Sequence, residues 1–144
     1  MNVHLSAPTE PYSALHGLVK GEGELCYAVR NAAGKLIPTG CRKVSVVYDT
    51  GAAKSILHPK VAPEALFPRG PAEPVRGAGR SRYPTTIAFL RTSGCVRALI
   101  GPWVSPDPPE AFDVDVVVGD DYMEVANVLV SPSRRAAGCS ASKR

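Results

Sequence analysis

Residues 46–55 read Val-Val-Tyr-Asp-Thr-Gly-Ala-Ala-Lys-Ser and place a carboxylate in a turn directly after an apolar, β-branched run. An ionised Asp is costly to bury, so a strand that enters a core and ends in Asp49 needs a reason for that charge. Gly51 permits a positive φ, and Asp49 or Thr50 can hydrogen-bond the local backbone. Taken alone, the tripeptide is also an ordinary turn signal that ends a strand.

The residues on either side of the tripeptide favour a functional role. The residues that follow the turn are small and then apolar, namely Ala52, Ala53, Ser55, Ile56 and Leu57. The extended pattern is two apolar residues, any residue, Asp-Thr-Gly-Ala, two further residues and Ser. It resembles the active-site segment of retropepsin-like aspartic proteases from retroviruses and LTR retrotransposons. The resemblance implies that Asp49 is catalytic and that Thr50, Gly51 and Ala52 support the active site.

A second segment tests the resemblance, because the family carries two apolar residues followed by Gly near its C-terminal end. Residues 116–123 read Val-Val-Val-Gly-Asp-Asp-Tyr-Met and are similar to that segment in the retrotransposon branch. Between the two segments, residues 75–80 resemble a glycine-rich flap, although a glycine pair also suits an ordinary turn. The residues that would cross behind Asp49 are Val117, Val118 and Gly119. The residues that would contact the substrate are Arg76, Gly77, Ala78 and Gly79.

Composition predicts one all-β domain. The chain has 144 residues, with 14 prolines and 13 glycines between short apolar runs, which favours strands and frequent turns over helices. With the resemblance, the expected fold is a small closed acid-protease-like β-barrel, the retropepsin fold, which is homodimeric and has one short helix near its C-terminal end. Residues 1–20 are expected to form an N-terminal arm, residues 21–133 the retropepsin-like domain, and residues 134–144 a basic tail without regular structure.

Apolar alternation and turn signals set the expected strands. A hairpin is expected from residues 23–30 through a turn at 31–35 into 36–37. The other expected strands are residues 43–49, 55–58, 85–90, 96–100, 112–118 and 128–130, the last of which closes the sheet.

Helix and loop signals fall between these strands. Asp120 can cap a short helix that ends at Val125 or Ala126. Residues 59–74 and 102–109 are rich in proline and are expected to be loops, the first with a helical turn near Glu64.

The net charge of +4 is concentrated in the last segment. Without its four basic residues the chain has 13 basic and 13 acidic residues. The tail lacks aromatic residues, so we expect no nucleic-acid partner beyond a weak RNA contact there. No apolar stretch approaches the roughly 20 residues of a membrane helix, and the polar start lacks the pattern of a signal peptide. We expect a soluble, intracellular protein without a membrane partner, in the cytoplasm or in a virus-like particle.

Other chemistries have weaker support in the sequence. The four cysteines, among them Cys26 and Cys41, form no Cys-x-x-Cys pair, so no metal site is expected and free thiols in a reducing compartment are favoured. A Cys–His catalytic pair stays open, although His58 before a proline reads as a loop residue. Asp113 and Asp115 could be read as a glycosidase pair on one strand face, but a solvated face explains them more simply.

The mechanism follows from what one carboxylate can do. Hydrolysis of an amide without a metal or a covalent nucleophile needs one group to take a proton from water and another to give one to the carbonyl oxygen. Two neighbouring carboxylates that share a proton do both. The chain has one Asp-Thr-Gly segment and is too short for two lobes, so the second carboxylate should be Asp49 of another subunit. No cofactor is needed, and the expected substrate is a polypeptide, most simply a retroelement polyprotein.

Two alternatives remain, and the chain also departs from the retroviral pattern. The protein could be a catalytically silent module for dimerisation or peptide binding, or a basic-tailed protein associated with nucleic acid. Retroviral members often pair an acidic residue after Asp-Thr-Gly-Ala with an Arg after the second motif, but Ala53 and Asp120 occupy these places. The ion pair of the retroviral pattern is therefore not expected here, and the subsite contacts near Ala53 and Lys54 and the dimer contacts are expected to differ from that pattern.

Overall fold

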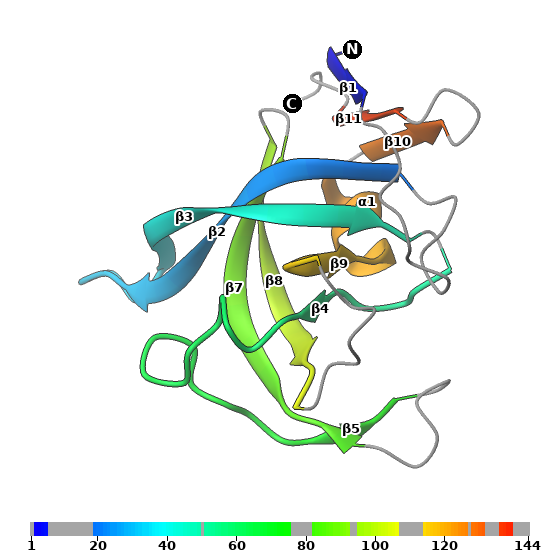
Figure 1. Ribbon diagram of the computed structural model, residues 1–144. Coiled ribbons are helices and arrows are strands. Elements are labelled where there is room, and N and C mark those ends of the chain that lie inside the picture. Colours follow the sequence, from blue (N-terminus) through cyan, green and yellow to red (C-terminus); the bar gives the residue numbers. More distant parts are fainter. Residues whose placement is uncertain are drawn as a thin grey trace.

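The computed structural model describes residues 2–5, 19–49, 51–75, 82–92, 95–106, 114–126, 128–131 and 136–139. Six strands close a barrel in the order β2-β3-β9-β4-β8-β7 (Figure 1). The prediction of an all-β barrel with a short helix near its C-terminal end is confirmed, while the homodimer stays a prediction. The bounds are Val19–Arg30 (β2), Leu36–Tyr48 (β3), Ile56–Leu57 (β4), Thr85–Thr92 (β7), Cys95–Val104 (β8), Val116–Val118 (β9) and Asp120–Ala126 (α1).

The expected hairpin is present, and its second strand is longer than expected. Asn31 fixes the turn, because its Oδ1 accepts the backbone N–H of Ala33 at 2.9 Å and of Lys35 at 3.0 Å. Gly34 takes a φ of 82°, which glycine adopts without strain. Strand β3 then runs from Leu36 to Tyr48 without the break that we expected between residues 37 and 43. Pairing with β2 along this length overrides the turn signals of the intervening sequence.

Side chains that alternate along the strands fill the barrel. On β7, Ala88 and Leu90 are buried while Ile87 and Arg91 are exposed, as the period of two predicts. Burial of a Leu side chain contributes about 1.5–3 kcal/mol to folding. The largest fully buried side chains include Tyr122, Leu25, Leu57, Leu90, Leu99, Val46 and Val118.

Strand β8 extends into a segment that we expected to be a loop. Residues 102–109 were assigned to a loop because of their prolines, but β8 continues to Val104. Gly101 has a φ of 84°, and the pairing of β7 with β8 is irregular next to it, so a bulge accommodates Pro102 without breaking the strand. Trp103 then pairs with Ile56 of β4. The extension brings the Trp103 side chain to the end of the barrel.

A disulfide joins β2 and β3. Cys26 and Cys41 are bonded, with their Cα atoms 4.0 Å apart. The expectation of free thiols is wrong for this pair. The register of β2 on β3 shifts between Leu25 and Tyr27, and this irregularity places the two cysteines opposite each other, which sequence spacing does not reveal. The expected reducing compartment rested on unpaired cysteines and loses that support.

Two further sheets lie outside the barrel. Strand β11 (Ala136–Cys139) pairs with β1 (Asn2–Leu5) and β10 (Val128–Ser131). The strand expected at 128–130 is therefore present, but it belongs to this separate sheet and does not close the barrel. Both terminal segments contribute a paired strand, and the domain limits at residues 21 and 133 stay a prediction. A two-stranded hairpin, β5 (Glu73–Pro74) with β6 (Arg82–Tyr83), lies at the opposite end (Figure 1).

The short helix α1 is present where we expected it, but Asp120 is its first residue and not its cap. Gly119 O accepts the backbone N–H groups of Tyr122 and Met123, each at 3.1 Å, so Gly119 precedes the helix and Asp120 is its first residue. Tyr122 and Met123 are buried in the barrel core. The helical turn expected near Glu64 is also present, because Pro63 O accepts Leu66 N at 3.0 Å.

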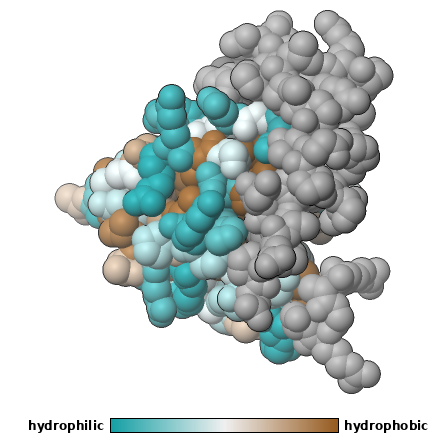
Figure 2. Space-filling model, in the orientation of Figure 1, coloured by the Kyte–Doolittle hydropathy of each residue, from teal (hydrophilic) through white to brown (hydrophobic). Residues whose placement is uncertain are grey.

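Polar side chains cover much of the face shown in Figure 2, with apolar atoms visible between them. Among the described residues, no helix has both the length and the apolar character that crossing a membrane requires.

Candidate active site

Asp49 lies in a turn that its own carboxylate helps to form. The residue follows β3 directly, and its backbone N–H donates to Val118 O at 2.9 Å. Asp49 Oδ1 accepts the N–H of Gly51 at 2.9 Å, and Asp49 O accepts the N–H of Ala52 at 3.1 Å. The side chain is half-buried. Thr50, predicted to support the site, lies outside the described residues.

The second motif lies directly behind this turn. Strand β9 runs parallel to β3 with Tyr48 opposite Val118, and antiparallel to β4 with Ile56 opposite Val117. Val118 is fully buried in the barrel core, and Val117 faces the other side of β9, where Ile56 packs against it. Val118 is thus joined directly to Asp49, and Val117 lies one residue earlier on β9, opposite Val47.

Gly119 is packed too closely for any side chain. A Cβ atom at this position would lie 2.7 Å from the backbone carbon of Lys54 and 2.8 Å from Ala52 O. Backbone atoms at such distances cannot move aside cheaply, so the site requires glycine. The loop of residues 51–55 therefore packs directly on the junction between β9 and α1.

A buried network that sequence reasoning missed holds this loop in place. Ser55 is fully buried, and its Oγ donates to Asp121 Oδ1 at 2.7 Å and accepts the N–H of Gly119 at 3.0 Å. The Ser55 N–H also donates to Asp121 Oδ1, at 3.0 Å. A carboxylate with two short hydrogen bonds is a strong acceptor. Ser55 lies in the first motif quoted from the sequence and Asp121 lies in the second. Their presence in these two motifs was the signal that could have linked them.

Two backbone hydrogen bonds complete the attachment of the loop to α1. Asp120 N donates to Ala52 O at 2.8 Å, and Asp121 N donates to Ala53 O at 3.2 Å. The predicted support residue Ala52 therefore acts through its backbone, on the loop between Asp49 and Ser55.

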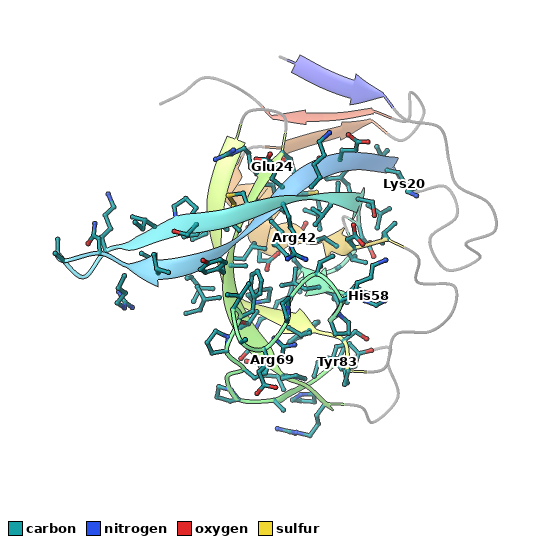
Figure 3. All side chains as sticks on the ribbon, turned by 60° about the vertical axis from the view of Figure 1, so that its left-hand side comes forward. Lys20, Glu24, Arg42, His58, Arg69 and Tyr83 are labelled. Carbon is teal, nitrogen blue, oxygen red and sulfur yellow. A yellow bond between two sulfur atoms is a disulfide. The ribbon has the colours of Figure 1, made fainter. Side chains whose placement is uncertain are left out.

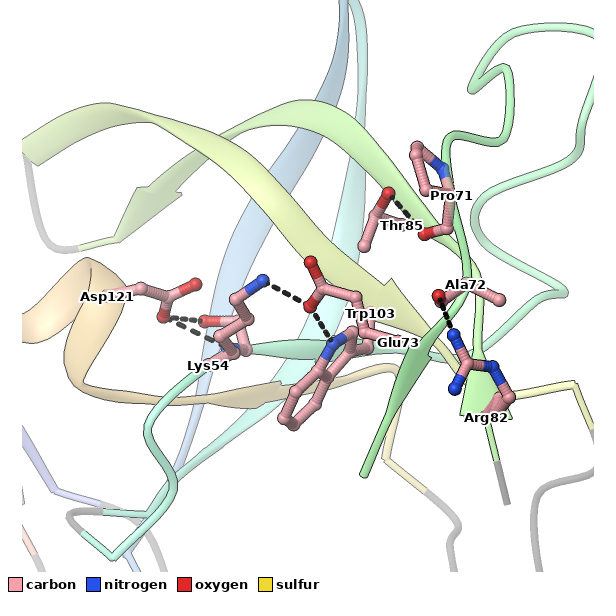
Figure 4. Close-up of polar contacts among 9 residues, drawn as sticks. Lys54, Pro71, Ala72, Glu73, Arg82, Thr85, Trp103 and Asp121 are labelled. Atoms are coloured by element: carbon pink, nitrogen blue, oxygen red, sulfur yellow. Dashed lines mark hydrogen bonds and ion pairs between the residues drawn. The ribbon is translucent and has the colours of Figure 1, made fainter. Parts of the chain in front are cut away.

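A second polar cluster lies on the other side of the loop (Figure 4). Glu73 Oε1 accepts hydrogen bonds from Lys54 Nζ at 2.6 Å and from Trp103 Nε1 at 2.9 Å. These two hydrogen bonds, that of Lys54 first, lower the pKa of Glu73. We did not predict this cluster, because the sequence carries no motif that connects a loop, β5 and β8.

Tyr48, the last residue of β3, directly precedes the turn and belongs to the barrel core. Its side chain is buried, and burial raises the pKa of its phenol, an effect that a hydrogen bond with Thr92 partly offsets. Thr92 Oγ1 also shares a hydrogen bond of 2.8 Å with the hydroxyl of Tyr122. Two buried hydroxyl groups next to the active-site strand thus have partners, as buried polar groups require.

Among the remaining sequence candidates, Asp115 is described and takes part in other contacts. Asp115 Oδ2 accepts Ser45 N at 2.8 Å and its Oδ1 lies 3.4 Å from Lys60 Nζ, which gives it a structural role. Asp113, its proposed glycosidase partner, lies outside the described residues, as do the flap residues Arg76, Gly77, Ala78 and Gly79. Within the described ranges, no group of His, Cys, Asp and Glu is arranged to hold a metal ion.

Two of the four cysteines are excluded as the nucleophile of a Cys–His catalytic pair. Cys26 and Cys41 are joined in a disulfide, so neither sulfur can be a thiolate there. His58 Nδ1 accepts the backbone N–H of Lys60 at 3.2 Å, as a loop histidine commonly does. Desolvation, and next the charge of Lys60, lower the pKa of His58, against a smaller opposite effect of Asp115.

Two solved structures are similar to this chain. The first is the crystal structure of the retroviral protease-like domain of Ddi1 from Leishmania major, with 15% identity and a TM-score of 0.47; the match covers 83% of this chain and 89% of that chain. The second is a retropepsin-like aspartic protease from Rickettsia conorii, with 17% identity, a TM-score of 0.42, and coverage of 74% and 81%. No protein-family model matches the chain, and no curated protein sequence matches it. Both similarities are modest, so the assignment of function rests on the geometry of the Asp49 turn.

Proposed function

We propose that the protein is an aspartic endopeptidase that acts as a homodimer, with Asp49 of each subunit in a shared site. The observation that carries this proposal is the Asp49 turn. Its backbone is fixed by Val118 and Ala52, and one carboxylate oxygen is held by Gly51. Among the described residues the other oxygen, Oδ2, has no hydrogen-bond partner, and the side chain is half-buried. A fixed carboxylate with one unoccupied oxygen can receive a proton from water.

The chemistry requires a second carboxylate of the same kind. In the proposed site one Asp49 is ionised and its counterpart in the other subunit is protonated, because two charges held close together are costly. The ionised carboxylate takes a proton from water while the water oxygen attacks the peptide carbonyl carbon. The protonated carboxylate gives its proton to the carbonyl oxygen. The tetrahedral intermediate then collapses and the C–N bond breaks. The first carboxylate gives the leaving amine the proton that it took from water, and a hydroxyl of the intermediate returns a proton to the second carboxylate as the new carboxyl group forms.

A two-fold axis through the turns would supply this arrangement. Symmetry places identical turns face to face without a second copy of the motif in one chain. The proposed substrate is an extended polypeptide, most simply a retroelement polyprotein processed inside the cell, and we assign its contacts to Arg76, Gly77, Ala78 and Gly79. The proposed supporting role of Thr50 is a hydrogen bond across the axis.

The test is cleavage of an unfolded protein and a peptide library between about pH 4 and 6, where a carboxylate dyad is half-protonated. Asp49→Asn should abolish cleavage, because an amide cannot take the proton from water. Asp120→Asn is the matched control, since it removes the same charge from a nearby residue whose contact with the loop is made by its backbone. Cleavage by Asp49→Asn at the wild-type rate would refute the mechanism.

Sedimentation separates the remaining possibilities. A strict monomer at high protein concentration would exclude a shared site. A dimer that cleaves nothing in either test would identify the silent module instead. Activity per subunit should rise with protein concentration, because only the dimer holds two Asp49 carboxylates.

A further inference from the structure

One carboxylate oxygen joins three separate parts of the chain beside the Asp49 loop. Glu73 on β5 accepts hydrogen bonds from Lys54, in the loop after Asp49, and from Trp103, near the end of β8. Lys54 Nζ also lies 5.5 Å from the centre of the Trp103 ring, a distance at which a cation is attracted to the ring face. We propose that Glu73 is a positioning residue that holds the Asp49 loop in the conformation that binds a peptide.

On the side of β8, Ser55 O accepts the backbone N–H of Trp103 at 3.0 Å, which attaches only the C-terminal end of the loop. Its attachments to α1, through Ala52, Ala53 and Ser55, all lie on one flank. Gly51 and Ala53 are exposed, and Lys54 is half-buried, so apolar burial does not fix the loop from the other flank. The Lys54 side chain extends away from Asp121 toward Glu73 (Figure 4). The Lys54–Glu73 ion pair joins the middle of the loop to β5.

Glu73 is itself held in place from its own side. Strand β5 pairs with β6, with Glu73 opposite Tyr83, and Arg82 Nη2 donates to Ala72 O at 2.8 Å. The Tyr83 ring packs edge-on against Trp103, with ring centres 6.5 Å apart. A carboxylate on a supported strand is preorganised, so the flexible Lys54 side chain adjusts to it and not the reverse.

This inference rests on the proposed function, in which an extended peptide lies over the Asp49 turn. A loop already held in its binding conformation lowers the entropic cost of binding a peptide. Asp49 itself is fixed by Val118 and Gly51, so loss of Glu73 should leave the chemical step largely intact. Hydrogen bonds from Lys54 and Trp103 lower the pKa of Glu73, which favours the charged form of its carboxylate.

The test compares two equivalent ion pairs. Glu73→Gln removes the charge next to the loop. Glu24→Gln removes it from the Glu24–Arg91 pair, which has the same 2.6 Å separation and similar exposure, 37% for Glu24 against 42% for Glu73. Figure 3 shows Glu24 and Tyr83, which packs on Trp103, at opposite ends of the barrel.

We expect Glu73→Gln to raise KM about three- to tenfold and to change kcat less than about twofold. Glu24→Gln should change neither. Both variants should unfold within about 4 °C of the wild type, because exposed ion pairs contribute little to stability. Equal kinetic constants for the two variants would overturn the inference. A fall in kcat with an unchanged KM, together with a lower Tm, would do so too, because it would indicate a merely structural role.

Reversal of the pair gives a second kinetic test. Lys54→Glu and Glu73→Lys each place like charges together and should raise KM at least as much as Glu73→Gln. The double variant restores opposite charges and should recover part of the loss, although Lys at position 73 cannot accept the Trp103 N–H. No recovery in the double variant would contradict a positioning role for the ion pair.

Binding to an inactive protein separates this inference from the proposed activity. A fluorescein-labelled, carboxymethylated polypeptide that stays unfolded is titrated into Asp49→Asn, with and without Glu73→Gln, and fluorescence anisotropy gives the Kd. We expect Glu73→Gln to weaken binding about three- to tenfold. If the wild type cleaves nothing, the proposed function fails, and this comparison still decides the role of Glu73. Equal behaviour of the two proteins, including no measurable binding by either, would overturn it.

Discussion

Ser55 offers the sharpest test of how the active-site loop is held. Its hydroxyl is fully buried and has two partners, Asp121 Oδ1 at 2.7 Å and the N–H of Gly119 at 3.0 Å. Ser55→Ala removes both hydrogen bonds with almost no change in shape. The Gly119 N–H is left buried without that acceptor, and the Asp121 carboxylate keeps only the Ser55 N–H among these hydrogen bonds.

The size of the effect follows from these contacts. A hydrogen bond to a charged group contributes about 1.5–3 kcal/mol, and a buried donor left without a partner costs about 1–3 kcal/mol. The two losses overlap, so we expect Ser55→Ala to reduce the free energy of unfolding by about 2–4 kcal/mol. For a chain of this size, about 1 kcal/mol corresponds to roughly 3–4 °C in Tm. The expected decrease in Tm is about 6–16 °C.

A second buried serine provides the matched control. Ser105 is 1% exposed, and its Oγ has no hydrogen-bond partner among the described residues. Ser105→Ala removes a hydroxyl that is desolvated without compensation, so it should leave stability within about 1 kcal/mol of the wild type or raise it. Urea unfolding followed by Trp103 fluorescence measures both variants. Equal losses for Ser55→Ala and Ser105→Ala would refute the assigned role of the Ser55 network.

Three further predictions concern packing, pH and redox state. Gly119→Ala would place a methyl group 2.7 Å from the backbone carbon of Lys54 and should cost at least about 1–3 kcal/mol; an unchanged urea midpoint would contradict this packing. His58 has a pKa lowered from 6.5, so below that pH the unfolded chain binds more protons than the folded protein and stability decreases. His58→Gln should therefore lose less stability than the wild type between pH 7 and 5. The Cys26–Cys41 disulfide spans 15 residues, so reduction should lower the free energy of unfolding by up to about 3 kcal/mol, whereas a Cys26→Ala, Cys41→Ala double variant should not respond to reductant.

Local sequence signals predicted those parts of the fold that local chemistry determines. The turn at Asn31 and Gly34 is formed by its own side chain and backbone, so a hairpin could be expected from residues 23–37 alone. The extension of β8 could not be predicted in this way, because Gly101 and Pro102 are typical loop residues in isolation. Trp103 pairs with Ile56, which is distant in sequence, and this pairing makes Gly101 and Pro102 part of a strand. Tertiary pairing overrides local preference at such positions.

The same distinction applies to the candidate active site. Asp49 and Gly51 form their turn within three residues, and the motif could therefore be recognised. Ser55 and Asp121 are 66 residues apart, and Lys54 and Glu73 are 19 apart; no local pattern connects either pair. Sequence reasoning thus identified the carboxylate and missed the contacts that fix the loop around it.

These contacts bear on the departure from the retroviral pattern that the sequence showed. In the place of an ion pair between the two motifs, the chain has backbone hydrogen bonds from the first turn of α1 to Ala52 and Ala53. Charged residues stand one position later in each motif, at Lys54 and Asp121. Lys54 donates to Glu73, and Asp121 accepts a hydrogen bond from Ser55. Backbone hydrogen bonds do not depend on side-chain charge, so an acid at position 53 and a base at position 120 are not needed to join the loop to α1.

The loop is instead attached on two sides by two independent networks, one buried and one half-exposed. Since buried hydrogen bonds contribute to stability far more than exposed ion pairs, loss of the Ser55 network should unfold the site, whereas loss of the Glu73 network should leave a folded protein that binds peptides less tightly.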